Sequence, residues 1–129
     1  MYKYREFIKN KYGGKCAYTG TDLLPDWEID HCIPKSMKLQ SFHKISNHND
    51  TNNLFPCQKI VNHYKGSLDL ETFRNWYLGG LHQRLKNLPK NPKTEKSIKK
   101  KAYLLEVARL FNIQPDKPFS GVFYFEMLS

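Results

Sequence analysis

The chain has 129 residues, of which 40% are hydrophobic, 14% aromatic and 26% charged. This composition is typical of one folded domain and excludes a disordered chain, and no stretch reaches the roughly 18 apolar residues of a membrane-spanning helix. Lys and Arg outnumber Asp and Glu by 21 to 12, so the net charge of +9 favours a polyanionic partner such as DNA, RNA or an anionic membrane surface.

The cysteines and the first residues indicate an intracellular protein. Cys16, Cys32 and Cys57 are too few, and odd in number, for a disulfide framework. The opening residues contain no apolar stretch of the kind that secretory leaders have. We therefore expect a cytoplasmic location.

The first half of the chain predicts two helices and two short strands around a long polar loop. Trp27, Ile29 and His31 alternate with polar residues, which is typical of a strand, and Gly66 is a typical helix stop. The expected elements are a helix over 2–12, a strand over 27–31, a loop over 35–52, a strand over 53–56 and a helix over 57–66.

The second half is predicted to be mainly helical. One helix is expected from Ser67 to about Leu88, bent at Gly79-Gly80, and another over 94–112 with an apolar stripe. Residues 121–126 are rich in aromatic residues and are expected to form a terminal strand. The fold class is therefore α+β. The stripe of the second helix is formed by Ile98, Leu105, Ala108 and Phe111, flanked by Leu104 and Val107.

Positive charge is concentrated between residues 82 and 101, which contain eight Lys and Arg residues and one acidic residue, Glu95. Such a run is a phosphate-contacting patch or, in the plainer alternative, a solvated helix face. The residues that we expect to contact nucleic acid are Arg84, Lys86, Lys99, Lys100 and Lys101.

The residues with the clearest chemistry are Asp30, His31 and Asn62. Adjacent side chains in a regular strand point to opposite faces, so Asp30 and His31 serve one site only if the strand ends or kinks there. If the helix over 57–66 packs across the strands, the amide of Asn62 approaches Asp30. One carboxylate and one amide oxygen suit a hard divalent cation.

Four segments, in this order and spacing, resemble the HNH endonucleases, or ββα-metal nucleases. The segments are Cys16–Gly20, Glu28–Ser36, Asn49–Leu54 and Val61–Gly66. The family's typical pattern is a Cys-rich turn, a strand ending in Asp-His, an Asn-containing segment before the second strand, and a helix carrying His or Asn. The likeness covers residues 5–67, about half of the chain.

The resemblance implies a small ββα-metal core over residues 1–67 and assigns roles within it. His31 would be the general base, Asn53 a catalytic residue that fixes the loop and orients the histidine, and Asp30 and Asn62 the ligands of one Mg²⁺ or Mn²⁺. His63 and Lys65 are further candidates, the first as an extra ligand and the second close to the phosphate. The expected activity is metal-dependent hydrolysis of phosphodiester bonds in DNA, with RNA as the alternative substrate.

Many family members also hold a structural zinc with two Cys-x-x-Cys pairs, and this chain has lost most of that set. Thr19 replaces one cysteine of the first pair, and the second pair falls at Gln58 and Val61. We therefore expect no structural zinc. Apolar packing of Tyr18, Trp27, Phe55 and Val61 would replace it, while a makeshift site of Cys16, Cys57 and Cys32 or His63 is the alternative.

Residues 68–129 are expected to form a helical extension that packs with the core as one domain. The chain would be the nuclease component of a restriction or anti-phage defence system, with a protein partner supplying specificity. The alternatives are a non-catalytic nucleic-acid-binding module and a nuclease toxin domain.

Overall fold

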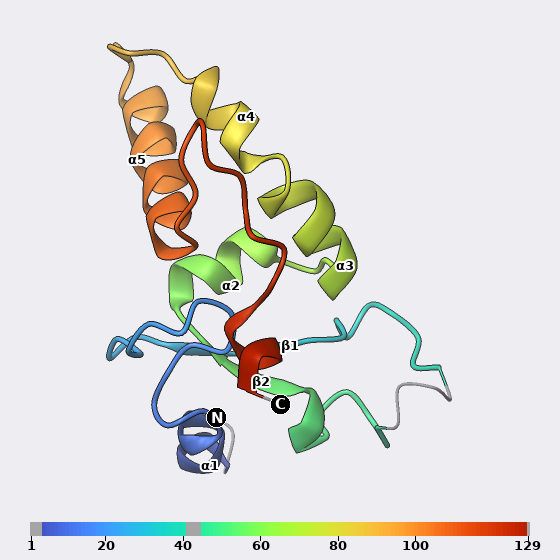
Figure 1. Ribbon diagram of the computed structural model, residues 1–129. Coiled ribbons are helices and arrows are strands. Elements are labelled where there is room, and N and C mark those ends of the chain that lie inside the picture. The colour runs from blue at the N-terminus through green and yellow to red at the C-terminus, as the bar shows by residue number, and fades with distance from the viewer. Residues whose placement is uncertain (1–3, 41–44, 129) are drawn as a thin grey trace. The chain divides into compact units, whose positions relative to one another are not determined.

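The computed structural model describes residues 4–40 and 45–128, and it confirms the α+β class with a two-stranded antiparallel sheet and several helices (Figure 1). Within the described residues, no helix is both long and apolar enough to cross a membrane. The chain divides into two compact units, one of residues 1–71 with 122–129 and one of residues 72–121. The last segment thus belongs with the first unit and not with the C-terminal helices with which the sequence grouped it.

The sheet of the first unit is a short antiparallel pair. Strand β1 (Glu28–His31) lies against β2 (Leu54–Cys57), with Glu28 opposite Cys57 and His31 opposite Leu54. The 3-10 helix Thr51–Asn53 leads into β2, and helix α2 (Lys59–Lys65) follows β2 and packs against β1. This sequence of elements agrees with the alternation around Trp27 and with the stop at Gly66. Part of the expected loop over 35–52, residues 41–44, lies outside the described residues.

The core of the first unit has an aliphatic part and an aromatic part. Helix α1 (Arg5–Asn10) buries Ile8 against Trp27 and Leu54. The aromatic part is a set of edge-to-face and tilted ring contacts between Tyr18, Phe55, Phe123 and Phe125.

The expected strand over 121–126 is wrong. Tyr124–Leu128 is a 3-10 helix. The amides of Tyr124 and Phe125 donate to the carbonyls of Tyr18 and Ala17, while the Phe123 and Phe125 rings enter the aromatic core. The aromatic residues that raised the strand propensity are therefore used for packing. At Gly20, where φ is +75°, a Cβ would lie 2.6 Å from the Tyr124 ring, so only glycine fits beneath it.

The second unit is helical. Helix α3 (Leu70–Thr72) leads into a π-helix over Phe73–Leu78, and α4 (Leu81–Lys86) follows. The single helix expected from Ser67 to Leu88 is thus interrupted at Gly79-Gly80, where a bend was expected. A Cβ on Gly79 would lie 2.4 Å from the Asn75 carbonyl oxygen.

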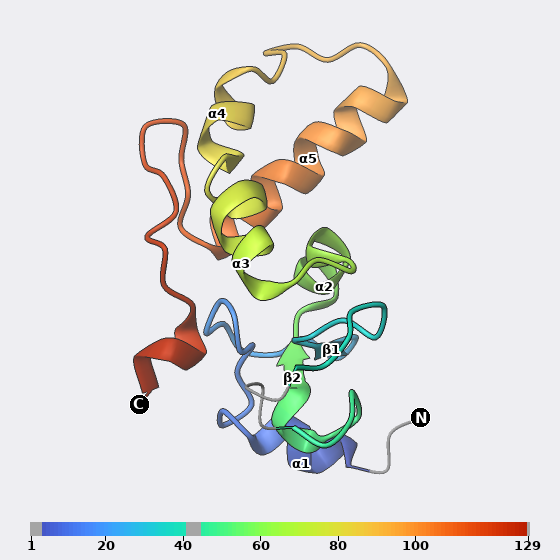
Figure 2. The same ribbon diagram turned by 90° about the vertical axis from the view of Figure 1, so that its right-hand side faces the viewer.

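Helix α5 (Glu95–Leu110) begins with a capping box of Thr94 and Ser97 and packs beside α4 (Figure 2). Its apolar face agrees with the expected stripe in part. Ala108 and Phe111 are buried as expected, together with the flanking Leu104 and Val107, whereas Ile98 and Leu105 are 50% and 46% exposed. Leu104 and Leu105 are adjacent and lie on different faces of the helix, and packing buries Leu104.

Candidate active site

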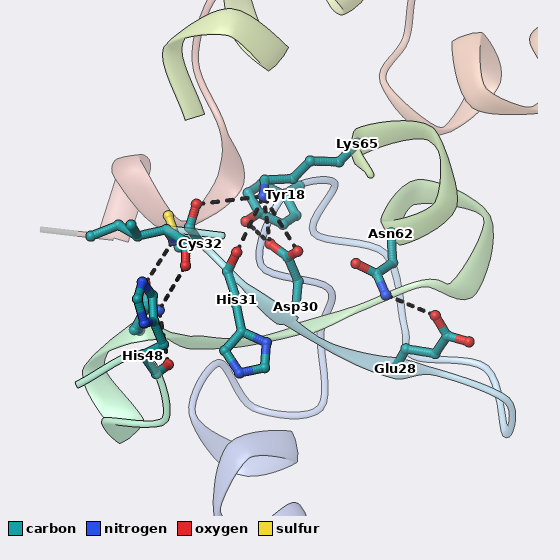
Figure 3. Close-up of polar contacts among 10 residues, drawn as sticks. Tyr18, Glu28, Asp30, His31, Cys32, His48, Asn62 and Lys65 are labelled. Atoms are coloured by element: carbon teal, nitrogen blue, oxygen red, sulfur yellow. Dashed lines mark hydrogen bonds and ion pairs between the residues drawn. The ribbon is translucent and has the colours of Figure 1, made fainter. Parts of the chain in front are cut away.

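Three of the residues assigned from the sequence line one small pocket in the first unit. Asp30 and His31 come from the end of β1 and Asn62 comes from α2, around a cavity of about 190 Å³ that Pro34 and Lys35 also line. Figure 3 shows the Asp30 carboxylate and the His31 ring pointing to opposite sides of the strand, as the pleat requires. Both residues nevertheless border the same cavity.

A buried ion pair holds Asp30. The Asp30 side chain is 4% exposed, accepts a hydrogen bond from the Tyr18 hydroxyl and lies 3.3 Å from the Lys65 ammonium. Lys65 is itself fully buried, and its Nζ also donates to the carbonyl oxygens of His31, at 3.3 Å, and Cys32, at 3.4 Å (Figure 3). Burial, with the Asp30 charge beside it, raises the pKa of Tyr18 well above its usual range, so this phenol stays a donor.

Lys65, which the resemblance would place close to a phosphate, lies in the buried ion pair with Asp30. Its ammonium group is enclosed between α2 and the end of β1, where it compensates the Asp30 charge. A helical position three residues after Asn62 turns its side chain onto the strand. Helix packing buries Lys65. The residue type alone would predict an exposed side chain, because lysine is charged.

His31 is oriented by a neighbour that the sequence analysis quoted without giving it a role. His31 Nε2 lies 2.9 Å from Asn49 Oδ1. A neutral ring that donates Nε2–H to this oxygen has Nδ1 as its basic nitrogen. Asn49 lies in the loop before β2, so only its place in the matched segment Asn49–Leu54 pointed to it.

Asn53 fixes the loop between the strands but does not line the pocket. It is 2% exposed, its Oδ1 accepts from the Ile33 amide at 2.8 Å, and its Nδ2 donates to the Ile33 and His48 carbonyls at 3.1 and 3.0 Å. The Cys32 amide donates to the Asn53 carbonyl. Asn53 thus connects the segment after His31 to the segment that contains Asn49, and it is the Asn49 side chain that bonds the histidine ring.

Asn62 is bonded to Glu28, a residue that the sequence analysis did not select. Asn62 Nδ2 donates to Glu28 Oε1 at 2.7 Å, and its oxygen is turned toward Asp30 (Figure 3). His63 is exposed, lies with its Nε2 3.6 Å from the same Glu28 oxygen, and does not line the pocket. Strand alternation places Glu28 on the same face as Asp30, which is the signal that would have identified it.

The region in which the resemblance would place zinc ligands is held by hydrogen bonds as well as by apolar packing. Gln58 is 3% exposed, donates to Thr21 Oγ1 at 2.9 Å and to the Asp22 carbonyl at 2.7 Å, and accepts from the Leu24 amide at 3.1 Å. Gln58 is one of the two positions at which the HNH-like pattern would require a cysteine. Its amide therefore joins the turn over 15–22 to the start of α2.

The three cysteines differ in the pKa of their thiols. Burial raises the pKa of Cys16, but hydrogen bonds from Cys57, Thr19 and Gln58 outweigh it and bring the value to about 6. Burial raises the pKa of Cys57 well above its usual range and that of Cys32 to about 11.

Among residues 4–40 and 45–128, no group of three or more His, Cys, Asp or Glu side chains is arranged to hold a metal ion.

The basic residues selected from the sequence lie in the second unit, and most of them have partners there. Lys99 pairs with Glu95 at 2.9 Å, Lys101 donates to the Pro89 and Lys90 carbonyls, and Arg84 donates to the Tyr77 carbonyl. Over the described part of the chain, Lys86 and Lys100 have no hydrogen bond or ion pair. Residues 72–121 contain eleven Lys and Arg against three Asp and Glu, so this unit holds +8 of the net charge of +9.

Comparison with known proteins adds no relative. No protein-family model, curated protein or solved structure matches this chain.

Proposed function

We propose that this chain is a metal-dependent endonuclease of the ββα-metal, or HNH, type that acts on DNA in the cytoplasm. The observation that carries the proposal is the meeting of Asp30, His31 and Asn62 at one pocket, on an antiparallel strand pair followed by a helix. The high positive charge of residues 72–121 supports a nucleic acid as substrate.

The donors at the pocket fit a hard cation. Asp30 offers a carboxylate and Asn62 turns an amide oxygen toward it, beside a cavity that leaves room for water and phosphate oxygens. Such oxygen donors suit Mg²⁺ or Mn²⁺. When bound by these two residues, the cation supplies Lewis-acid stabilisation of the negative charge on the phosphate.

His31 performs the proton transfer in this proposal. In this proposal the neutral His31 ring donates its Nε2–H to Asn49 Oδ1, and Nδ1 accepts the proton of the attacking water. Water then attacks phosphorus opposite the 3′ oxygen, and the bond between phosphorus and that oxygen breaks. The leaving oxygen takes a proton from solvent, so the products are a 5′-phosphate and a 3′-hydroxyl. Lys65 keeps the adjacent carbonyl oxygens of His31 and Cys32 in place, and so holds the end of β1 that carries the base.

Plasmid nicking tests the proposal. We expect the wild type to nick supercoiled plasmid with Mg²⁺ or Mn²⁺ and to stop when the metal is chelated. The His31→Ala variant should cleave at least about 100-fold more slowly, which is the usual contribution of a positioned general base. Equal cleavage by the two proteins would refute the role of His31.

One alternative rests on a specific observation. The second unit, with its charge of +8, suits a nucleic-acid-binding module without catalysis. Tight DNA binding by a wild type that cleaves neither plasmid nor single-stranded substrates with any divalent metal would favour that module.

In the nuclease proposal, a protein partner in a restriction or anti-phage system supplies sequence specificity.

A further inference from the structure

The side chain of Asn62 has two chemically different ends, and only one of them can bind a cation. The amide oxygen is an acceptor with lone pairs, whereas the NH₂ group only donates hydrogen bonds. An Asn62 turned by 180° about its last torsion would direct NH₂ toward Asp30 and repel a metal. The proposed function therefore requires that something in the protein fixes the orientation of this amide.

Glu28 has the chemistry to fix it. An ionised carboxylate only accepts hydrogen bonds, so the Asn62 atom that faces Glu28 Oε1 at 2.7 Å must be the nitrogen. The amide oxygen is then directed to the other side, toward Asp30, as Figure 3 shows. A hydrogen bond to a charged acceptor is also stronger than one between neutral groups.

The backbone places Glu28 rigidly enough for this role. Glu28 is the first residue of β1, paired with Cys57 of β2, and it shares a strand face with Asp30 two residues later. Asn62 lies in the middle of α2, which packs against β1. The Glu28 side chain is 33% exposed, so its carboxylate is partly shielded from water by the helix.

We propose that Glu28 is a positioning residue, which holds the Asn62 amide with its oxygen toward Asp30 and so makes Asn62 able to bind a divalent cation. This inference rests on the proposed function. Residues that orient metal ligands in this way typically contribute about 10- to 100-fold to metal affinity.

The test compares Mn²⁺ affinity, measured by electron paramagnetic resonance of the free ion, across a matched set of variants. Glu28→Ala should bind Mn²⁺ about 10- to 100-fold more weakly than wild type, whereas Glu6→Gln, a change at an exposed acid of α1, should bind as wild type does. Melting temperatures of the same proteins separate loss of the ligand from loss of the fold.

The outcomes distinguish the two proposals. If wild type binds Mn²⁺ and Asn62→Ala weakens binding, but Glu28→Ala does not, the positioning role is overturned and the nuclease proposal stands. If wild type binds no Mn²⁺, both fall. Nuclear magnetic resonance of the Asn62 side-chain NH₂ gives a readout without metal: its protons should exchange slowly in wild type and fast in Glu28→Ala, and equal exchange would also overturn the role.

Discussion

Replacement of Lys65 by Met should strongly destabilise the first unit. The variant keeps a long, flexible apolar side chain but removes the ammonium group. In the wild type that group is fully buried, lies 3.3 Å from Asp30 and donates to the carbonyl oxygens of His31 and Cys32. Without it, the Asp30 carboxylate stays at a 4% exposed position without a neighbouring cation.

The size of the effect follows from this geometry. Removing one partner of a buried ion pair typically costs about 3–5 kcal/mol, because the other charge is left uncompensated. Asp30 keeps the hydrogen bond from Tyr18, so we expect a loss of about 3 kcal/mol, at the lower end of that range. For a unit of this size the melting temperature should fall by roughly 4–8 °C for each kcal/mol.

Urea unfolding followed by tryptophan fluorescence can measure this loss of stability in the first compact unit separately from the second. The chain has two tryptophans: Trp27 lies in the first unit and is 6% exposed, whereas Trp76 lies in the second and is 73% exposed. In a Trp76→Phe background the emission comes from Trp27 alone and reports the first unit. The double variant Lys65→Met/Asp30→Asn removes both charges and should recover much of the lost stability. A loss below about 1 kcal/mol, or a double variant no more stable than the single one, would refute the proposed charge compensation.

Three further outcomes are expected. Gln58→Ala removes three hydrogen bonds at a 3% exposed site and should cost about 2–3 kcal/mol in urea unfolding; a change below about 0.5 kcal/mol would show that apolar packing alone holds the turn. The Lys86→Ala/Lys100→Ala variant should keep its melting temperature and lower the slope of log affinity against log salt by about 0.9 per lost duplex contact, and an unchanged slope would mean a solvated helix face. Burial raises the pKa of Cys32 from 9.0 to about 11, so its thiolate at pH 7 should be about 100-fold scarcer than that of an ordinary thiol. Alkylation followed by mass spectrometry should therefore find Cys32 nearly unreactive at pH 7, with a labelling rate that increases as the pH rises. Rapid labelling at pH 7 would contradict this prediction.

Local sequence determined the short elements and the candidate residues of the site. The alternation around Ile29 located β1, Gly66 located the end of α2, and Gly79-Gly80 located the interruption before α4. Each of these signals acts through the conformation or burial of neighbouring residues, so it can be read without knowledge of the fold. Asp30, His31 and Asn62 were likewise selected by residue type and spacing, and the structure brings them to one pocket.

Only the tertiary structure decided which partner each polar side chain has. Lys65 looks like a surface lysine until helix packing buries its ammonium group against Asp30. Glu28 becomes the partner of Asn62 only when α2 lies on β1, and Asn49 contacts His31 although 17 residues separate them in the sequence. The terminal segment has strand-like residues, yet Phe123 and Phe125 pack beside Tyr18 and the backbone forms a 3-10 helix. Contacts between residues far apart in the chain depend on how elements pack, and packing is not encoded in local periodicity.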